Sequence, residues 1–170
     1  PSPRGRGALW RLMRFDPETE LYQIIAQSLT TQEEMTFQSI ERSLDAQEKA
    51  LAEHPRTRQD VSGTAALMGM YGREYVVRVS GGGLNIPYDQ VWLEAVALRP
   101  DLVARHLDLQ VERAIRQIGG LAQIGVKLIF GGGDFAANEG TFYSPQAFHE
   151  LMRPRLQQIA EACHRHGMYY

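Results

Sequence analysis

The chain has 170 residues, of which 44% are hydrophobic and 22% are charged, which is the composition of an ordinary soluble globular domain. Its net charge of −2 and its pI near 6.2 argue against a dedicated nucleic-acid-binding protein. No apolar run approaches the ~20 residues of a membrane-spanning helix, and the single cysteine, Cys163, excludes an internal disulfide. We therefore expect a protein of a reducing compartment, the cytoplasm, that binds neither nucleic acid nor a membrane.

The N-terminal part of the chain is predicted to be rich in helix after a short tail. Residues 1–15 contain several arginines but no apolar segment, which predicts a basic, disordered tail rather than a secretory signal, with an Arg-rich organellar transit segment as the alternative. Asp16-Pro17 matches a helix N-cap followed by proline, and the apolar spacing predicts a helix over residues 21–29. Thr31 begins a capping box with Glu34, which predicts a second helix that ends at about Glu53.

The middle of the chain is predicted to contain shorter elements. Residues 59–63 are compatible with a short strand, and residues 74–79 fit either a strand or a helix. The glycine run Gly81–Gly83 predicts a loop. Asp89 is expected to cap a short helix that ends near Ala97.

The C-terminal part has the clearest pattern of the chain. A long amphipathic helix is predicted to open at Pro100 and to end at Gly125, directly before a strand over residues 126–130. Ser144-Pro145 predicts a further helix that Pro154 kinks or divides into two. Gly167 is expected to end this helix, and the next strand begins after it.

This alternation of helices and strands predicts an α/β fold with a parallel sheet. A closed (β/α)₈ barrel takes ~250 residues, so a chain of 170 residues accommodates three or four of its units. We therefore predict a portion of a (β/α)₈ TIM barrel, about half, with a helix-rich N-terminal part. The chain is then either a fragment or a truncated product.

The candidate catalytic group is Asp134, which follows the strand over residues 126–130 and the glycine run Gly131–Gly133. Carboxylates at the carboxyl end of a buried strand are typical of active sites in α/β proteins, and glycines permit close approach of a ligand. Asn138 and Glu139 in the same loop are candidate substrate-binding residues. The alternative is a tight turn that carries a solvated acid.

Other candidates are weaker. Arg153 lies beside Pro154 near a presumed helix start, where a cation is favoured if an anion binds there, and the alternative is a solvated surface residue. His164 and His166 diverge on a helix and cannot share one ion, so no metal site is expected. The two glycine runs match neither dinucleotide-binding nor P-loop spacing.

Several motifs in order resemble the uroporphyrinogen decarboxylase family over approximately residues 61–170. They are Pro100-Asp101-Leu102-Val103, Gly125-Val126, Gly133-Asp134-Phe135, Ser144-Pro145, Pro154, His164 and Gly167. The resemblance implies that residues 16–170 form a partial barrel domain with a pocket at the carboxyl ends of its strands. It assigns Asp134 to the acidic loop position of the family, and Ser62 and Gly63 to a strand end that faces the pocket and binds substrate.

The resemblance implies two kinds of enzyme. One is a carboxy-lyase that acts on a porphyrinogen or a related substrate without a cofactor. The other is a corrinoid- or thiol-dependent methyltransferase, and enzymes of this kind often hold zinc or use a corrinoid. Both kinds of enzyme act on a small-molecule substrate. The Arg-Gln-Ala-Gly-Arg-Tyr signature of true decarboxylases is absent from this sequence. A homodimer is a possible assembly, and a catalytically silent ligand-binding or interaction module is the alternative from another functional class.

Overall fold

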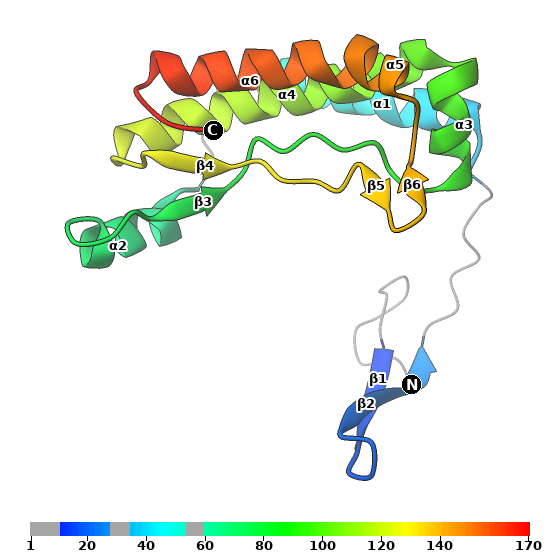
Figure 1. Ribbon diagram of the computed structural model, residues 1–170, viewed down its shortest axis with the longest axis horizontal. Helices are drawn as coiled ribbons and strands as arrows, with labels where there is room; N and C mark the ends of the chain where they lie inside the picture. Colours follow the sequence, from blue (N-terminus) through cyan, green and yellow to red (C-terminus); the bar gives the residue numbers. More distant parts are fainter. Residues whose placement is uncertain (1–10, 28–34, 54–59) are drawn as a thin grey trace. The chain divides into compact units, whose positions relative to one another are not determined.

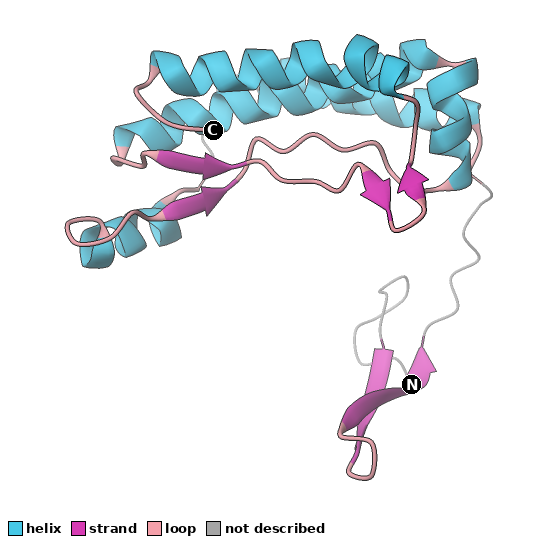
Figure 2. Ribbon diagram, viewed as in Figure 1, coloured by secondary structure: helices cyan, strands magenta, loops and turns pink. Residues whose placement is uncertain are grey.

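A computed structural model describes residues 11–27, 35–53 and 60–170 of the chain (Figure 1). The chain divides into two compact units, Pro1–Met35 and Thr36–Tyr170. Helices dominate the second unit, whereas the described part of the first unit is a pair of strands (Figure 2). None of the helices within the described ranges combines the length and the apolar composition that crossing a membrane requires.

The first unit contains an antiparallel hairpin of β1 (Arg11–Asp16) and β2 (Leu21–Gln27). The turn is organised by Asp16, whose carboxylate accepts hydrogen bonds from the backbone amide of Glu18 at 3.0 Å and from the side chain of Gln23 at 2.6 Å. A carboxylate that accepts the amide two residues along is an Asx-turn. Asp16 therefore starts a turn and not a helix.

The hairpin corrects two expectations for the N-terminal part. The helix predicted over residues 21–29 is wrong for Leu21–Gln27, which form β2, and residues 28 and 29 lie outside the described residues. Residues 11–15 of the predicted tail belong to β1, and residues 1–10 also lie outside the described residues. The apolar positions of β2 satisfy both periods, but its β-branched and aromatic side chains favour a strand.

The second unit begins with α1 (Phe37–Glu53), which ends where the sequence predicts. Its start is fixed by Thr36 and Ser39, which exchange capping bonds: the Ser39 amide donates to the Thr36 hydroxyl at 3.1 Å, and the Thr36 amide donates to the Ser39 hydroxyl at 2.9 Å. This pair satisfies amides that the first helical turn leaves free. The predicted capping residues Thr31 and Glu34 lie outside the described residues.

The next element is α2 (Ser62–Tyr71), where a short strand was expected over residues 59–63. The strand is wrong for Ser62 and Gly63, which open this helix, whereas Gln59 lies outside the described residues. The Asp60 carboxylate accepts the Ser62 amide at 2.9 Å, and alanines and methionines then continue the helix. The strand β3 (Arg78–Ser80) follows, so the segment 74–79 that fitted either structure forms a strand only at its last two residues.

The long helix α4 (Pro100–Gln123) is the centre of the second unit, and its start and length agree with the prediction. It contacts α1, the short helix α3 (Gln90–Leu98) and the helical run that begins at Pro145 (Figure 1). Its buried face repeats at helical spacing. The buried residues are Leu102, Val103, Leu107, Leu109, Val111, Ala114, Ile118 and Leu121.

Three parallel segments lie against this helical layer. β4 (Leu128–Phe130) pairs in parallel with β3, and Tyr169 forms a parallel bridge with Leu128 on the other side of β4. Figure 1 shows α4 and α6 on the same side of β3 and β4. The parallel segment predicted after Gly167 is therefore present as the bridge at Tyr169, and β3 and β4 form a second parallel pair with helices between its strands.

Two glycines carry the chain from a helix into a strand by the same turn. Gly125 after α4 and Gly167 after the last helix have φ values of 86° and 64°. In both turns the next residue donates its amide to a carbonyl five residues back, as Val126 does to Leu121 at 3.2 Å. This is the Schellman motif, and it buries the apolar residue that follows each glycine.

The helical run between these turns has three parts: α5 (Pro145–Ala147), the π-helix η1 (Phe148–Met152) and α6 (Arg153–Arg165). Ser144 caps the run by accepting the Ala147 amide at 3.1 Å, as predicted. The predicted interruption at Pro154 takes the form of the π-turn directly before it. A wider turn relieves the clash between the proline ring and the carbonyl four residues earlier.

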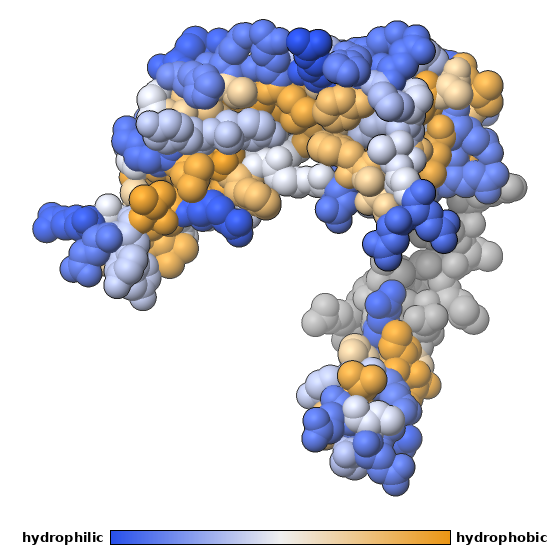
Figure 3. Space-filling model, in the orientation of Figure 1, coloured by the Kyte–Doolittle hydropathy of each residue, from blue (hydrophilic) through white to orange (hydrophobic). Residues whose placement is uncertain are grey.

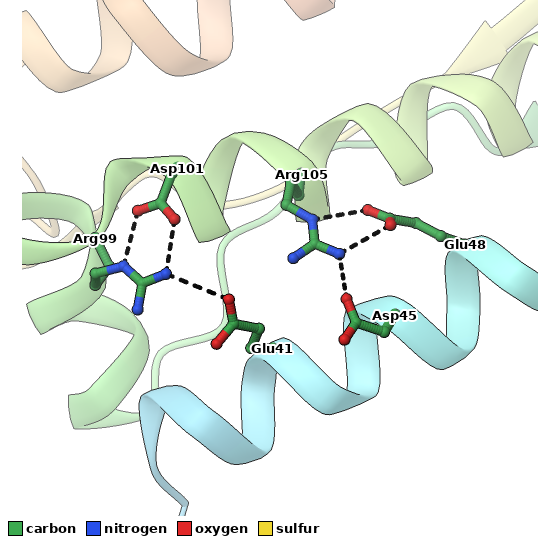
Figure 4. Close-up of polar contacts among 6 residues, drawn as sticks. All are labelled: Glu41, Asp45, Glu48, Arg99, Asp101 and Arg105. Atoms are coloured by element: carbon green, nitrogen blue, oxygen red, sulfur yellow. Dashed lines mark hydrogen bonds and ion pairs between the residues drawn. The ribbon is translucent and has the colours of Figure 1, made fainter.

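Ion pairs join α1 to α4 at their exposed rim (Figure 4). Arg105 of α4 binds both carboxylate oxygens of Glu48 at 2.8 Å and Asp45 at 2.6 Å. Near the start of α4, Arg99 binds Asp101 at 2.7 Å and reaches Glu41 at 3.7 Å. The hydrogen bonds from Arg105 lower the pKa of Glu48, and those from Arg99 lower the pKa of Asp101.

We expect these contacts to make stability fall in acid. The pKa of Glu48 in the folded state lies below its ordinary value of 4.5, so the contribution is complete above that pH and is lost as pH falls through the folded pKa. Arg105→Gln should lower the free energy of unfolding at neutral pH by ~0.2–1 kcal/mol and flatten its dependence on acid. Urea denaturation at several pH values measures both effects.

The control for this experiment is Lys49→Gln, which removes the exposed Lys49–Glu53 pair at 3.8 Å. Lys49 and Glu53 are 77% and 56% exposed, so this variant should keep the wild-type acid dependence. An unchanged acid dependence in Arg105→Gln would contradict the role given to Arg105.

Gly167→Ala tests the left-handed turn after α6. No atom lies within 4 Å of the position that a Cβ would take at Gly167, so alanine adds no clash and its cost comes from φ alone. We expect the free energy of unfolding to fall by ~1–2 kcal/mol. Gly119→Ala is the matched control, because Gly119 also has open space but lies inside α4, where alanine should stabilise by ~0.5–1 kcal/mol. Equal effects in a urea titration would contradict this account.

Candidate functional site

The candidate site is the loop that follows β4 at its carboxyl end. Asp134 lies in this loop and is exposed, and none of the described residues is hydrogen-bonded to its carboxylate. Its backbone is fixed, because the Tyr88 hydroxyl donates to the Asp134 carbonyl oxygen at 2.8 Å. The Tyr88 ring also packs on Phe142 at a centroid distance of 4.5 Å. Tyr88 thus joins the loop after β3 to both sides of the loop after β4.

The two glycine runs bring these loops together. A Cβ on Gly83 would lie 3.3 Å from the Gly132 carbonyl oxygen, and one on Gly131 would lie 2.3 Å from the Tyr170 hydroxyl. That hydroxyl donates to the Gly82 carbonyl oxygen at 3.0 Å. The absence of side chains at these glycines therefore allows the two loops and Tyr170 to lie close together.

Asn138 and Glu139 lie at the tip of a small hairpin in the same loop. Its strands are β5 (Ala136–Ala137) and β6 (Gly140–Thr141), which pair antiparallel. Asn138 and Glu139 are both exposed, and Gly140 completes the turn with φ of 148°. The hairpin places these two candidates in one loop with Asp134.

Aromatic side chains hold the base of this hairpin. Phe135 packs edge-on against Phe148 at 5.5 Å, and the Phe142 amide donates to the Phe135 carbonyl at 3.1 Å. The neighbouring Tyr143 has a buried hydroxyl without a hydrogen-bond partner among the described residues. Burial raises the pKa of Tyr143 to about 12, so the hydroxyl is neutral at physiological pH.

Ser62 and Gly63 do not join this site. They lie in the first turn of α2, and the preceding Val61 lies near Gly120, within 3.9 Å of the position that a Cβ would take there. Gly120 belongs to the C-terminal part of α4, which leads into the amino end of β4. Ser62 and Gly63 therefore lie near the amino ends of the strands, whereas Asp134 follows a carboxyl end. The prediction that they form the end of a strand facing the pocket is wrong, because they belong to the helix α2.

Arg153 is exposed at the first residue of α6, but the helix has no free start there. Its backbone amide donates to the Phe148 carbonyl because α6 continues η1 without a break. The electrostatic reason for an anion beside Arg153 is therefore lost. The neighbouring Arg155 binds Asp108 through two bonds of 2.7 and 3.0 Å and also donates to the Leu151 carbonyl.

The described residues hold no group of three or more histidine, cysteine or acidic side chains that could bind a metal. His164 and His166 are exposed at the end of α6. His106 packs against Trp92 at 4.6 Å and contacts Gln110 at 2.6 Å, and burial lowers its pKa. Gln110 in turn binds the amide and the carbonyl of Asn85, so this histidine supports the loop after β3.

Sequence reasoning missed Tyr88, Tyr143 and Arg78. Arg78 lies on β3, and its guanidinium carbon is 4.3 Å from the centroid of the Phe130 ring on β4. The alternation of Val77, Arg78, Val79 and Ser80 was the available signal, because it places Arg78 on the strand face opposite to the valines. No comparable pattern marks Tyr88 or Tyr143.

No protein family model, curated protein or solved structure matches this chain.

Tyr88 and Tyr143 are expected to respond in opposite ways to replacement by phenylalanine. Tyr88→Phe removes a hydrogen bond and should lower the free energy of unfolding by ~0.5–1.5 kcal/mol. Tyr143→Phe removes an unpaired buried hydroxyl and should leave stability unchanged or raise it by up to ~1 kcal/mol. Each variant is the control for the other in thermal and urea denaturation. A larger loss in Tyr143→Phe would show that its hydroxyl does have a partner.

Proposed function

We propose that the second unit forms consecutive βα units of a (β/α)₈ barrel, and that the protein is an enzyme similar to uroporphyrinogen decarboxylases. Support comes from the order of the parallel segments: β3, β4 and Tyr169 are neighbours in chain order. The helices between them lie on one side of the strands (Figure 1). In a barrel of this kind, the loops at the carboxyl ends of the strands surround the pocket.

The single observation that carries the proposal is the arrangement of Asp134. It combines a main chain fixed by Tyr88 with an exposed carboxylate at the carboxyl end of β4. A fixed backbone reduces the cost of positioning a charge, and an exposed carboxylate can accept hydrogen bonds from a substrate.

For a carboxy-lyase, the role of Asp134 is electrostatic. A proton from solvent adds to an electron-rich ring carbon and makes the substrate cationic. The bond to the carboxylate carbon then breaks, CO₂ leaves, and the electron pair of that bond neutralises the positive charge of the ring. An aspartate that accepts the ring N–H groups would stabilise the cation. Asn138 and Glu139 on the same hairpin would contact polar parts of the substrate.

Asp134→Asn is the decisive variant. It keeps the size of the side chain but removes the charge, so we expect kcat for porphyrinogen decarboxylation to fall by about 10²–10³, as when a main electrostatic group is lost. The assay follows CO₂ release and the chromatography of the oxidised products. Because Asp134 is exposed, the melting temperature should stay at the wild-type value.

Glu74→Gln is the matched control, since it removes an exposed carboxylate that lies before β3 and outside this loop, and it should turn over as the wild type does. Wild-type turnover by Asp134→Asn would refute the assignment. Methyl transfer to a thiol without CO₂ release would favour the methyltransferase alternative, in which zinc or a corrinoid takes part. Ligand binding without either reaction would favour the catalytically silent module.

A further inference from the structure

The segment between β3 and α3 is attached to the helical layer by its alternate residues. Leu84 and Ile86 are buried, with 1% and 2% of their surfaces exposed, whereas Asn85 between them is exposed. Figure 3 shows apolar surface beneath the hydrophilic outer face of the helices, along the path that this segment follows in Figure 1. Because the segment belongs to no strand, the Asn85 backbone forms its hydrogen bonds with a side chain of α4.

That side chain is Gln110, whose amide group is fully used. Its Oε1 accepts the Asn85 amide at 2.9 Å, and its Nε2 donates to the Asn85 carbonyl at 2.9 Å and lies 2.6 Å from Nε2 of His106. A backbone amide only donates and a carbonyl only accepts, so Asn85 fixes which end of the Gln110 amide is oxygen. Nε2 of His106 is therefore the acceptor, which requires a neutral ring with its proton on Nδ1. We call these three residues the clasp.

The surroundings of the His106 ring also disfavour its charged form. Trp92 of α3 packs on the ring at a centroid distance of 4.6 Å, and burial lowers the pKa of His106. The Asn85 carbonyl raises this pKa in part, and the positive charge of Arg113 on α4 lowers it further. Trp92 and Asn85, which come from the other elements at the ring, carry no charge. Burial is the largest of these effects, so the ring is neutral at physiological pH.

We propose that the clasp is a pH-sensitive switch, which a proton on Nε2 of His106 opens so that the Asn85 backbone is released from α4. The protonated nitrogen would face an N–H group of Gln110, and two donors cannot share a hydrogen bond. Turning the Gln110 amide over would supply an acceptor but would break both bonds to Asn85. The same segment continues to Tyr88, which holds Asp134, although the inference stands with or without catalysis there.

The test uses the full chain and needs no ligand. Hydrogen exchange followed by ¹H–¹⁵N NMR gives the protection factor of the Asn85 amide from about pH 8 to about pH 5. The His106 ring regains its ordinary pKa of 6.5 once the clasp opens, whereas the closed clasp holds the pKa lower. Protection should therefore be constant above pH 6.5 and fall by up to about ten-fold per pH unit below it, until the pKa of the closed state is reached. The acid response at Glu48 lies below pH 4.5, outside this range.

Two variants change the titrating pair in different ways. His106→Gln keeps an acceptor for Gln110 but cannot titrate, so the protection of Asn85 should be retained and should not depend on pH. Gln110→Glu replaces the N–H donor by a carboxylate, which should raise the pKa of His106 and remove the fall in protection. His164→Gln, at an exposed position near the end of α6, is the control and should keep the wild-type pH dependence.

The wild-type chain alone can overturn the proposal, so the result does not depend on the folding of a variant. The ¹⁵N shifts of the His106 ring near neutral pH should identify Nε2 as the unprotonated nitrogen, and a proton on Nε2 would contradict the clasp. An Asn85 amide without protection, or with protection that stays constant down to about pH 5, would also contradict it. The same fall in His106→Gln as in the wild type would assign the pH dependence to another group and overturn the proposal.

Discussion

Burial of one face of α4 is the constraint on which the second unit depends. This helix contacts α1, α3 and the run from η1 to α6, and its Schellman turn delivers the chain directly into β4. Each buried leucine or isoleucine contributes ~1.5–3 kcal/mol when it leaves water, so the stripe from Leu102 to Leu121 exceeds any ion pair on the rim in its effect. The strands then take their places against this face, and their carboxyl ends carry the loop of Asp134.

The C-terminal part of the second unit was predictable because its signals are local. Pro100, Gly125, Ser144 and Gly167 act through one turn of backbone, and each performs the role that its residue type favours. Local signals also explain why the hairpin of the first unit was mispredicted, because a local signal can fit two structures. Asp16 followed by proline begins a helix and a turn equally well, and the bonds that its carboxylate accepts from the Glu18 amide and from Gln23 of the partner strand distinguish them.

The candidate site was predictable at Asp134 but not in its surroundings. The loop position follows from the end of a strand, whereas the Tyr88 contact joins residues 46 positions apart, and no sequence period records it. The same holds for Gly131 and Tyr170, which meet across 39 positions. The strand predicted at Ser62 and Gly63 was wrong because the alanines and methionines that follow favour a helix more strongly than the preceding residues favour a strand.

The π-turn at Phe148–Met152 determines where this helix can change its length. Five residues there occupy the axial space that an α-helix gives to four, so the surplus residue is absorbed locally. Loss of one residue within it, together with replacement of Pro154, whose ring would otherwise clash with the carbonyl four residues earlier, would leave an α-helix with the faces on both sides still in phase. Loss of one residue inside Arg153–Arg165 would rotate every later side chain by ~100° and carry Cys163 off the core. Among related chains that share this helix, we therefore expect insertions and deletions at the π-turn and not in the helix that follows it.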